Sequence, residues 1–200
     1  MANIRDADIY VLIFILIVCN FSCRVSDKLR ITGRAEWGSQ PVIEDSLEHA
    51  IRYITIHHGG VEVSPDEDPH LYLQNLQLWS RNEKNWSDIP YHFLIDLQGR
   101  VYEGRPVCFP GDTNTDYDPS GHLLISIIGN YEVQEFTTDQ YTVLVELLVH
   151  FCTIYQLDPA VIKAHRDYTQ TACPGKNIYL YLENGRLISD VRHMLRGKKD

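Results

Sequence analysis

Short apolar runs rich in β-branched residues alternate along the chain with segments in which apolar residues recur at helical spacing. The runs predict buried strands at 51–56 and 123–128, shorter strands at 91–96 and 100–103, and a short strand or extended segment at 160–164. The helical spacing predicts helices near 69–82, 137–155 and 177–195. Because strands and helices alternate irregularly, we expect an α/β domain with a central mixed sheet flanked by helices.

Turn and capping residues set the limits of several of these elements. Thr137 and Gln140 have the spacing of a capping box at the start of a helix, and Pro159 follows its end. The sequence LQG at 97–99 predicts the turn between the two short strands. Gly185 weakens the middle of the last helix, which we nevertheless predict as one helix.

The N-terminus differs from the rest of the chain. Residues 9–19 form an unbroken apolar run, which is shorter than the roughly 20 residues of a membrane span and fits the core of a secretory signal. Ser22 and Cys23 resemble the end of a bacterial lipobox. We therefore expect residues 1–25 to be a signal or lipoprotein-type segment and 26–200 to be the functional domain. A lipid on Cys23 would anchor an exported periplasmic or cell-surface protein at a membrane; simple secretion and an uncleaved anchor are the alternatives.

The amino-acid composition and net charge of the chain argue against one class of binding partner. The chain has 200 residues, 44% of them hydrophobic, which suits one domain with a short appendage. Its formal net charge is −9, and basic residues cluster only in the tail at 196–199. This balance argues against nucleic acid as a partner, since a phosphate backbone attracts clusters of Lys and Arg. We expect a monomer.

Three residues have the chemistry of a zinc site. His57 ends a predicted buried strand, and His165 and Cys173 lie close together near the C-terminus. Two imidazoles and one thiolate leave the fourth tetrahedral position open, as in catalytic rather than structural zinc sites. Taken alone, His57 would be an ordinary buried histidine and Cys173 a buried thiol, so the inference depends on all three together.

The remaining cysteines of the domain leave two readings open. The separation of Cys108 and Cys152 permits a disulfide bond. Cys152 lies in an apolar helical stretch, where a buried free thiol is the commoner outcome.

Six short motifs occur along the chain in a recognisable order. They are RAEWG at 34–38, ITIHH at 54–58, IPYHFLI at 89–95, GRVYEGR at 99–105, ISIIGNY at 125–131, and the segment 165–175 with HRD and TACPG at its ends. In this order they resemble the zinc-dependent N-acetylmuramoyl-L-alanine amidases, which share a fold with peptidoglycan recognition proteins. The resemblance covers about 31–176. Departures are Gly59 and Gly60 after the first histidine, Ala164 before the second, and a loop at 111–121 that looks bacterial.

The resemblance implies a function and assigns roles. It makes His57, His165 and Cys173 the ligands of Zn²⁺, Tyr91 the catalytic tyrosine and Thr171 a supporting residue. The substrate would be the amide between N-acetylmuramic acid and L-alanine in peptidoglycan or muropeptides. A phenol such as that of Tyr91 can donate to the oxyanion that develops when an amide is attacked. Alone, Tyr91 would be a half-buried strand tyrosine and Thr171 a loop hydroxyl.

Two other functions fit the same sequence. One is a module that binds peptidoglycan without cutting it, which the retained ligand set disfavours. The other is a secreted antibacterial effector that uses the same chemistry. Several further residues have two readings. Trp79 and Trp86 would line a sugar-binding groove or lie in the core, His122 would reach the groove rim, His58 and His92 would serve packing, and Arg166 and Asp167 would support the metal ligand or be structural.

Overall fold

The computed structural model describes residues 29–43 and 49–197. The strands are β1 (Ile31–Thr32), β2 (Tyr53–His58), β3 (Phe93–Ile95), β4 (Val101–Glu103), β5 (His122–Ile127) and β6 (Ile162–Ala164). The helices are α2 (Pro69–Lys84), α3 (Thr138–Ile154), α4 (Lys176–Glu183) and α5 (Arg186–Gly197), with 3-10 turns η1 (Pro159–Val161) and η2 (His165–Asp167). Every predicted strand and helix has a counterpart in this order.

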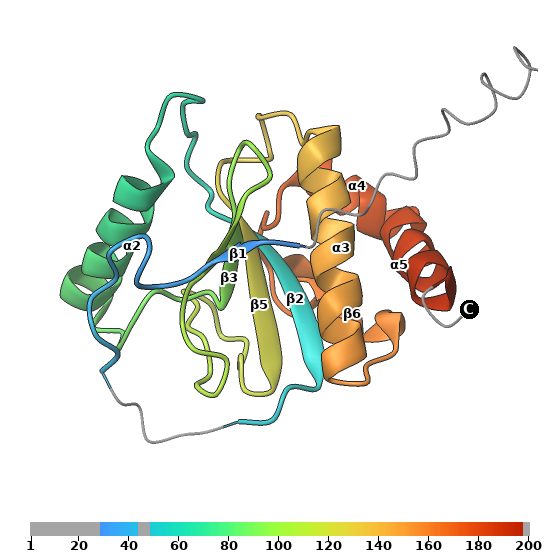
Figure 1. Ribbon diagram of the computed structural model, residues 1–200, viewed down its shortest axis with the longest axis horizontal. Coiled ribbons are helices and arrows are strands. Elements are labelled where there is room, and N and C mark those ends of the chain that lie inside the picture. The colour runs from blue at the N-terminus through green and yellow to red at the C-terminus, as the bar shows by residue number, and fades with distance from the viewer. Residues whose placement is uncertain (1–28, 44–48, 198–200) are drawn as a thin grey trace, which may run out of the picture.

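The strands form one six-stranded sheet in the order β1-β4-β3-β5-β2-β6. Only β3 and β4 pair antiparallel, and the other neighbours run parallel. The predicted mixed sheet is therefore confirmed. Since a parallel connection needs a crossover, helices are carried onto both faces, with α2 on one face and α3, α4 and α5 on the other (Figure 1).

Side chains that alternate along the strands fill two cores. In β3, Phe93 and Ile95 belong to the larger core with residues of α3 and α5. Leu94, between them, packs in a smaller core with Leu73 of α2 and with Trp37. This alternation is the period-two geometry of a strand buried on both faces.

The structure corrects two element boundaries. The first is the last helix, predicted as one helix over 177–195. It is two helices, because Gly185 adopts a left-handed φ of 75° that no continuous helix accommodates. The second is the strand predicted over 91–96, which begins only at Phe93, so Tyr91 precedes it in a loop. The capping box is confirmed, with Thr137 Oγ1 accepting from the Gln140 N–H and the Gln140 side chain accepting in return.

The described cysteines and helices settle two further points. Cys108 is exposed, Cys152 is buried, and both are free thiols, so the disulfide between them is absent. Within 29–43 and 49–197, no helix has the length and apolar character needed to cross a membrane. The predicted signal or lipoprotein-type segment at 1–25, with the lipid proposed on Cys23, lies outside the described residues and stays a prediction.

Candidate metal centre

The sheet topology brings the three predicted ligands to one edge. β2 and β6 are parallel neighbours, with Ile56 paired to Ala164. The carboxyl end of β2 therefore places His57 beside the start of η2, which begins with His165. Cys173 follows in the next loop, and the backbone N–H of Arg166 donates to the Cys173 carbonyl at 3.0 Å, which folds that loop back onto η2.

The three side chains converge on one point. Their ligand atoms all lie within 4.8 Å of one another, and all three residues are buried. Cys173 Sγ lies 3.6 Å from His57 Nδ1, and the imidazole centroids of His57 and His165 are 4.5 Å apart. Tetrahedral zinc with bonds of about 2.0–2.3 Å places its ligand atoms about 3.5 Å apart, so the group has suitable dimensions. Because His57 Nδ1 faces Cys173 Sγ, that nitrogen is the candidate ligand atom, and Nε2 on the other side of the ring is buried without a hydrogen-bond partner among the described residues.

Burial sets the protonation states of the ligands. It lowers the pKa of His57 well below its usual range, assisted by repulsion from His165 and other histidines, and burial also lowers the pKa of His165. Both rings are thus neutral and have lone pairs to offer. Burial raises the pKa of the Cys173 thiol to about 12. A divalent cation opposes that effect, because it deprotonates a coordinating thiol outright.

Two threonines that the sequence did not single out hold His165. Thr115 Oγ1 lies 2.8 Å and Thr113 Oγ1 3.3 Å from His165 Nε2, and the two hydroxyls are 2.9 Å apart. A hydrogen bond at one ring nitrogen commonly fixes the tautomer of a metal-binding histidine. Asp167 does not play this part, because its carboxylate accepts from the Ala164 N–H and the Tyr179 hydroxyl.

The three candidate ligands border a cavity of about 260 Å³, which also contains both predicted catalytic residues. The Tyr91 ring centroid lies 5.3 Å from that of His57. Burial and the neighbouring Cys173 raise the pKa of Tyr91, so its phenol stays protonated and able to donate. Thr171 Oγ1 accepts the backbone N–H of Cys173 at 3.2 Å, which orients its hydroxyl at the cavity wall.

Aromatic side chains extend the cavity away from the candidate ligands. Trp79 and Trp86 both line it, with their rings edge to face at a centroid distance of 5.9 Å, and Trp79 is 40% exposed. They therefore belong to the cavity and not to the core. His58, expected to point away from His57, also borders the cavity, while its Nδ1 accepts the Tyr131 N–H at 3.1 Å.

The other histidines considered from the sequence have structural contacts. His92 links two segments, since its Nδ1 accepts from the Leu124 N–H and its Nε2 lies 2.9 Å from the Phe109 carbonyl. His122 Nδ1 lies 2.8 Å from Thr55 Oγ1 and does not line the cavity. A larger cleft of about 650 Å³ lies between β6, α4 and α5, but the candidate ligands are not part of its lining.

A family model described as N-acetylmuramoyl-L-alanine amidase matches residues 47–176. The chain belongs to this amidase family. Its relatives in the family include peptidoglycan-recognition protein SC2 of Drosophila melanogaster, 32% identical over 168 residues that cover 82% of this chain and 91% of the relative. Mouse peptidoglycan recognition protein 1 is 30% identical over 161 residues, which cover 77% of this chain and 86% of that protein.

Solved structures confirm the amidase-family fold. The crystal structure of Drosophila peptidoglycan recognition protein SD superimposes with a TM-score of 0.70 at 28% identity, covering 78% of this chain and 94% of that one. These relatives are animal proteins. The bacterial character expected from the loop at 111–121 has no support from them and stays a prediction.

Proposed function

We propose that this amidase-family chain is a zinc-dependent hydrolase that cleaves the amide between N-acetylmuramic acid and L-alanine. The observation that carries the proposal is the buried group of His57, His165 and Cys173 beside Tyr91 in one cavity. Three ligands leave one tetrahedral position for water or substrate, which is the arrangement of catalytic zinc.

In this proposal, the bound zinc, Tyr91 and Thr171 would each contribute to hydrolysis. Zinc, when bound, would lower the pKa of a water molecule to about 7 and polarise the scissile carbonyl. As the carbonyl oxygen gains charge, the Tyr91 phenol would donate a hydrogen bond to it. The Thr171 oxygen already accepts the Cys173 N–H, so its own proton is free to be directed at the same oxygen. The attacking water would form a C–O bond to the carbonyl carbon, the C–N bond would break, and a proton from that water would pass to the departing amine of the stem peptide, which leaves a carboxylate on the N-acetylmuramic acid side.

The substrate class is inferred from related structures. The ectodomain complex of recognition proteins LCa and LCx, of which the matched chain is 26% identical to this one with a TM-score of 0.67, was crystallised with tracheal cytotoxin. Tracheal cytotoxin, also bound in the structure of peptidoglycan recognition protein LE, is a monomeric diaminopimelic acid-type peptidoglycan. We infer that this chain likewise takes a peptidoglycan fragment in the cavity. Trp79 and Trp86 would provide apolar contact with its sugar or peptide, as aromatic rings commonly do in ligand sites.

A second candidate is a module that binds peptidoglycan without cleaving it. It is favoured by the names of the relatives, which are recognition proteins. The retained candidate ligands and Tyr91 favour the hydrolase.

The proposal also includes export of the protein, with a lipid on Cys23 or simple secretion as the two possibilities. A secreted antibacterial effector would use the same chemistry.

The deciding experiment is mass spectrometry of purified muropeptides incubated with the protein, with and without a zinc chelator. We expect chelator-sensitive release of stem peptide beginning with L-alanine. Cys173→Ser should lose zinc and activity together, whereas Cys108→Ser, which alters an exposed free thiol far from the ligand group in sequence, should keep both. Binding of intact muropeptides without cleavage would support the recognition module and refute the hydrolase.

A further inference from the structure

Arg105 is a buried charged side chain that contacts two residues lining the candidate cavity, Tyr91 and Asp112. It is 1% exposed, although an arginine is seldom buried unless its charge and donors are matched. Its guanidinium donates to the carbonyls of Ile89 at 3.0 Å, Asp88 at 3.0 Å and Pro110 at 2.5 Å, and it pairs with the carboxylate of Asp112. This set of partners satisfies the buried charge.

These partners belong to two different segments. Asp88 and Ile89 lie just before Tyr91, and the backbone N–H of Arg105 donates to the Tyr91 carbonyl at 2.8 Å. Pro110 and Asp112 begin the loop on the other side. The two segments also touch directly, because the Asp112 N–H donates to the Pro90 carbonyl at 3.2 Å and a Cβ on Gly111 would come within 2.5 Å of that carbonyl oxygen. Arg105 therefore joins two closely packed segments.

The second segment leads directly to a candidate metal ligand. Thr113 follows Asp112 in the chain, and both line the cavity with Asn114 and Thr115. The hydroxyl of Thr115 lies 2.8 Å from His165 Nε2. Asp112 begins the short loop 112–115, and Thr115 at the end of that loop contacts the His165 ring. Holding Asp112 in place therefore also restricts where Thr115 can lie.

We propose that Arg105 is a positioning residue for this site. By binding both segments, it sets the distance between the Tyr91 phenol and the hydroxyl that orients His165. Loss of its geometry lets the loop with Thr113 and Thr115 shift, so that the His165 ring is less well oriented and metal binds more weakly. This inference rests on the proposed metal-dependent function, but metal affinity tests it without turnover.

Lysine is the informative replacement because it keeps the charge and loses the geometry. A guanidinium has five donors in a rigid plane and can serve several acceptors at once, whereas an ammonium is a point charge with three donors. The four acceptors of Arg105 lie on two segments, so the lysine of Arg105→Lys cannot reach all of them from one position.

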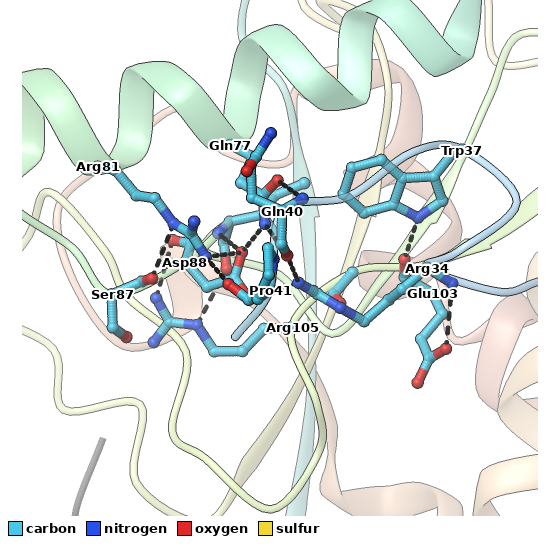
Figure 2. A network of polar contacts seen from close by, with 12 residues as sticks. Arg34, Trp37, Gln40, Pro41, Gln77, Arg81, Ser87, Asp88, Glu103 and Arg105 are labelled. Atoms are coloured by element: carbon cyan, nitrogen blue, oxygen red, sulfur yellow. Dashed lines mark hydrogen bonds and ion pairs between the residues drawn. The ribbon is translucent and has the colours of Figure 1, made fainter. Parts of the chain in front are cut away.

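Arg34 supplies a matched control on the same network. Its side chain is 12% exposed and pairs with the Asp88 carboxylate at 2.8 Å, and it donates to the carbonyls of Gly104 and Gln40. Arg34 and Arg105 approach the Asp88 segment from different directions (Figure 2). None of these contacts of Arg34 is with the loop that starts at Pro110, so Arg34→Lys changes the charge pairing of Asp88 and leaves the contacts of Arg105 with that loop in place.

The test is zinc affinity, measured by competition with a chromophoric chelator on the full chain, together with thermal unfolding of each variant. We expect Arg105→Lys to weaken zinc binding by about 10-fold or more, the usual effect of losing a group that orients a ligand. Thr115→Val should weaken it to a similar extent, and Thr115→Ser should restore it. Because Arg105 acts through Thr115, the double variant Arg105→Lys/Thr115→Val should bind no more weakly than the weaker single variant. Arg34→Lys should bind as tightly as the unaltered protein.

Two results with the variants would overturn the inference. One is unaltered zinc affinity in Arg105→Lys with a loss of thermal stability like that of Arg34→Lys, since Arg105 would then be only a structural residue. The other is a double variant whose loss of zinc-binding free energy equals the sum of the losses in the two single variants. Zinc binding without amide hydrolysis by the unaltered protein would refute the proposed function and leave the role of Arg105 to be judged by the affinities. An unaltered protein that binds no zinc would overturn both.

Discussion

The chemical role of Tyr91 is set by its surroundings. Burial and the nearby Cys173 raise the pKa of the phenol above its ordinary value, so at neutral pH it holds its proton. A protonated phenol in a cavity shared with the candidate ligands can donate to a developing oxyanion but cannot act as a general base. This separates the proposed role of Tyr91 from that of a bound metal ion, whose candidate ligands do not include Tyr91.

Tyr91→Phe should therefore keep zinc and lose turnover. We expect kcat on muropeptides to fall by about 10²–10³-fold, the usual cost of removing one oxyanion donor, with zinc stoichiometry unchanged. Tyr72→Phe is the matched control, since Tyr72 lines the same cavity but has no assigned part in the reaction. Steady-state kinetics beside metal analysis gives the result. Equal turnover in the two variants would remove Tyr91 from the mechanism.

Thr171→Val should have a smaller effect than Tyr91→Phe. The substitution removes the hydroxyl proton and also the acceptor for the Cys173 N–H, so we expect kcat to fall by less than about 10²-fold and zinc affinity to weaken. Thr171→Ser keeps both functions and should behave as the unaltered protein. A Thr171→Val enzyme with full kcat would restrict Thr171 to a structural part in the loop.

At the scale of elements, the break between α4 and α5 depends on one residue. Gly185 has a φ of 75°, and a Cβ placed there meets nothing within 4 Å. The cost of Gly185→Ala is thus conformational and free of steric clash. We expect a loss of about 1 kcal/mol in the free energy of unfolding, because only glycine adopts this backbone readily.

Urea denaturation checks the effect of Gly185→Ala, with Gly197→Ala as the control. A Cβ on Gly197 also meets nothing within 4 Å, and that residue has no left-handed φ. Gly197→Ala should therefore leave the unfolding free energy unchanged or raise it slightly. Equal effects of the two substitutions would show that the φ of Gly185 carries no cost.

The sequence predicted which helices and strands exist better than it predicted where they begin and end. Strands and helices follow from the periodicity of apolar residues, and the capping box at Thr137 follows from local chemistry alone. The same periodicity continues across Gly185, so the helix break was missed. Tyr91 was placed inside a strand because an apolar run says nothing about where pairing to a neighbouring strand begins. Both errors lie at the ends of helices or strands, where tertiary contacts decide the boundary and the pattern of apolar residues does not record them.

The candidate site was predictable only in part, for the same reason. The motifs around His57, His165 and Cys173 are local in sequence, and the structure brings these side chains together. Thr113 and Thr115 lie in an irregular loop with no period or turn signal of their own. Their contact with His165 spans about fifty positions of sequence, so only the folded chain reveals it.

Across the whole molecule, burial in the folded state keeps several histidines neutral. Burial lowers the pKa of His58 to about 4, that of His122 to about 4 and that of His92 to about 3. Their ring nitrogens contact backbone N–H groups, a hydroxyl and, for His92 Nε2, the Phe109 carbonyl, and none of these contacts is with a carboxylate. In the unfolded chain each ring regains an ordinary pKa of about 6.5, so protonation favours unfolding.

Stability should therefore fall as the pH drops below about 6.5. Between pH 6.5 and about 4 the unfolded state binds more protons than the folded state, so the free energy of unfolding decreases with falling pH. Each such histidine contributes up to about 1.4 kcal/mol per pH unit. Urea midpoints at pH 7, 6 and 5 with a chelator present measure this slope without metal linkage. His122→Gln, which can keep a hydrogen bond to Thr55, should give a shallower slope, and a midpoint that stays constant from pH 7 to 5 would contradict the neutral burial of these rings.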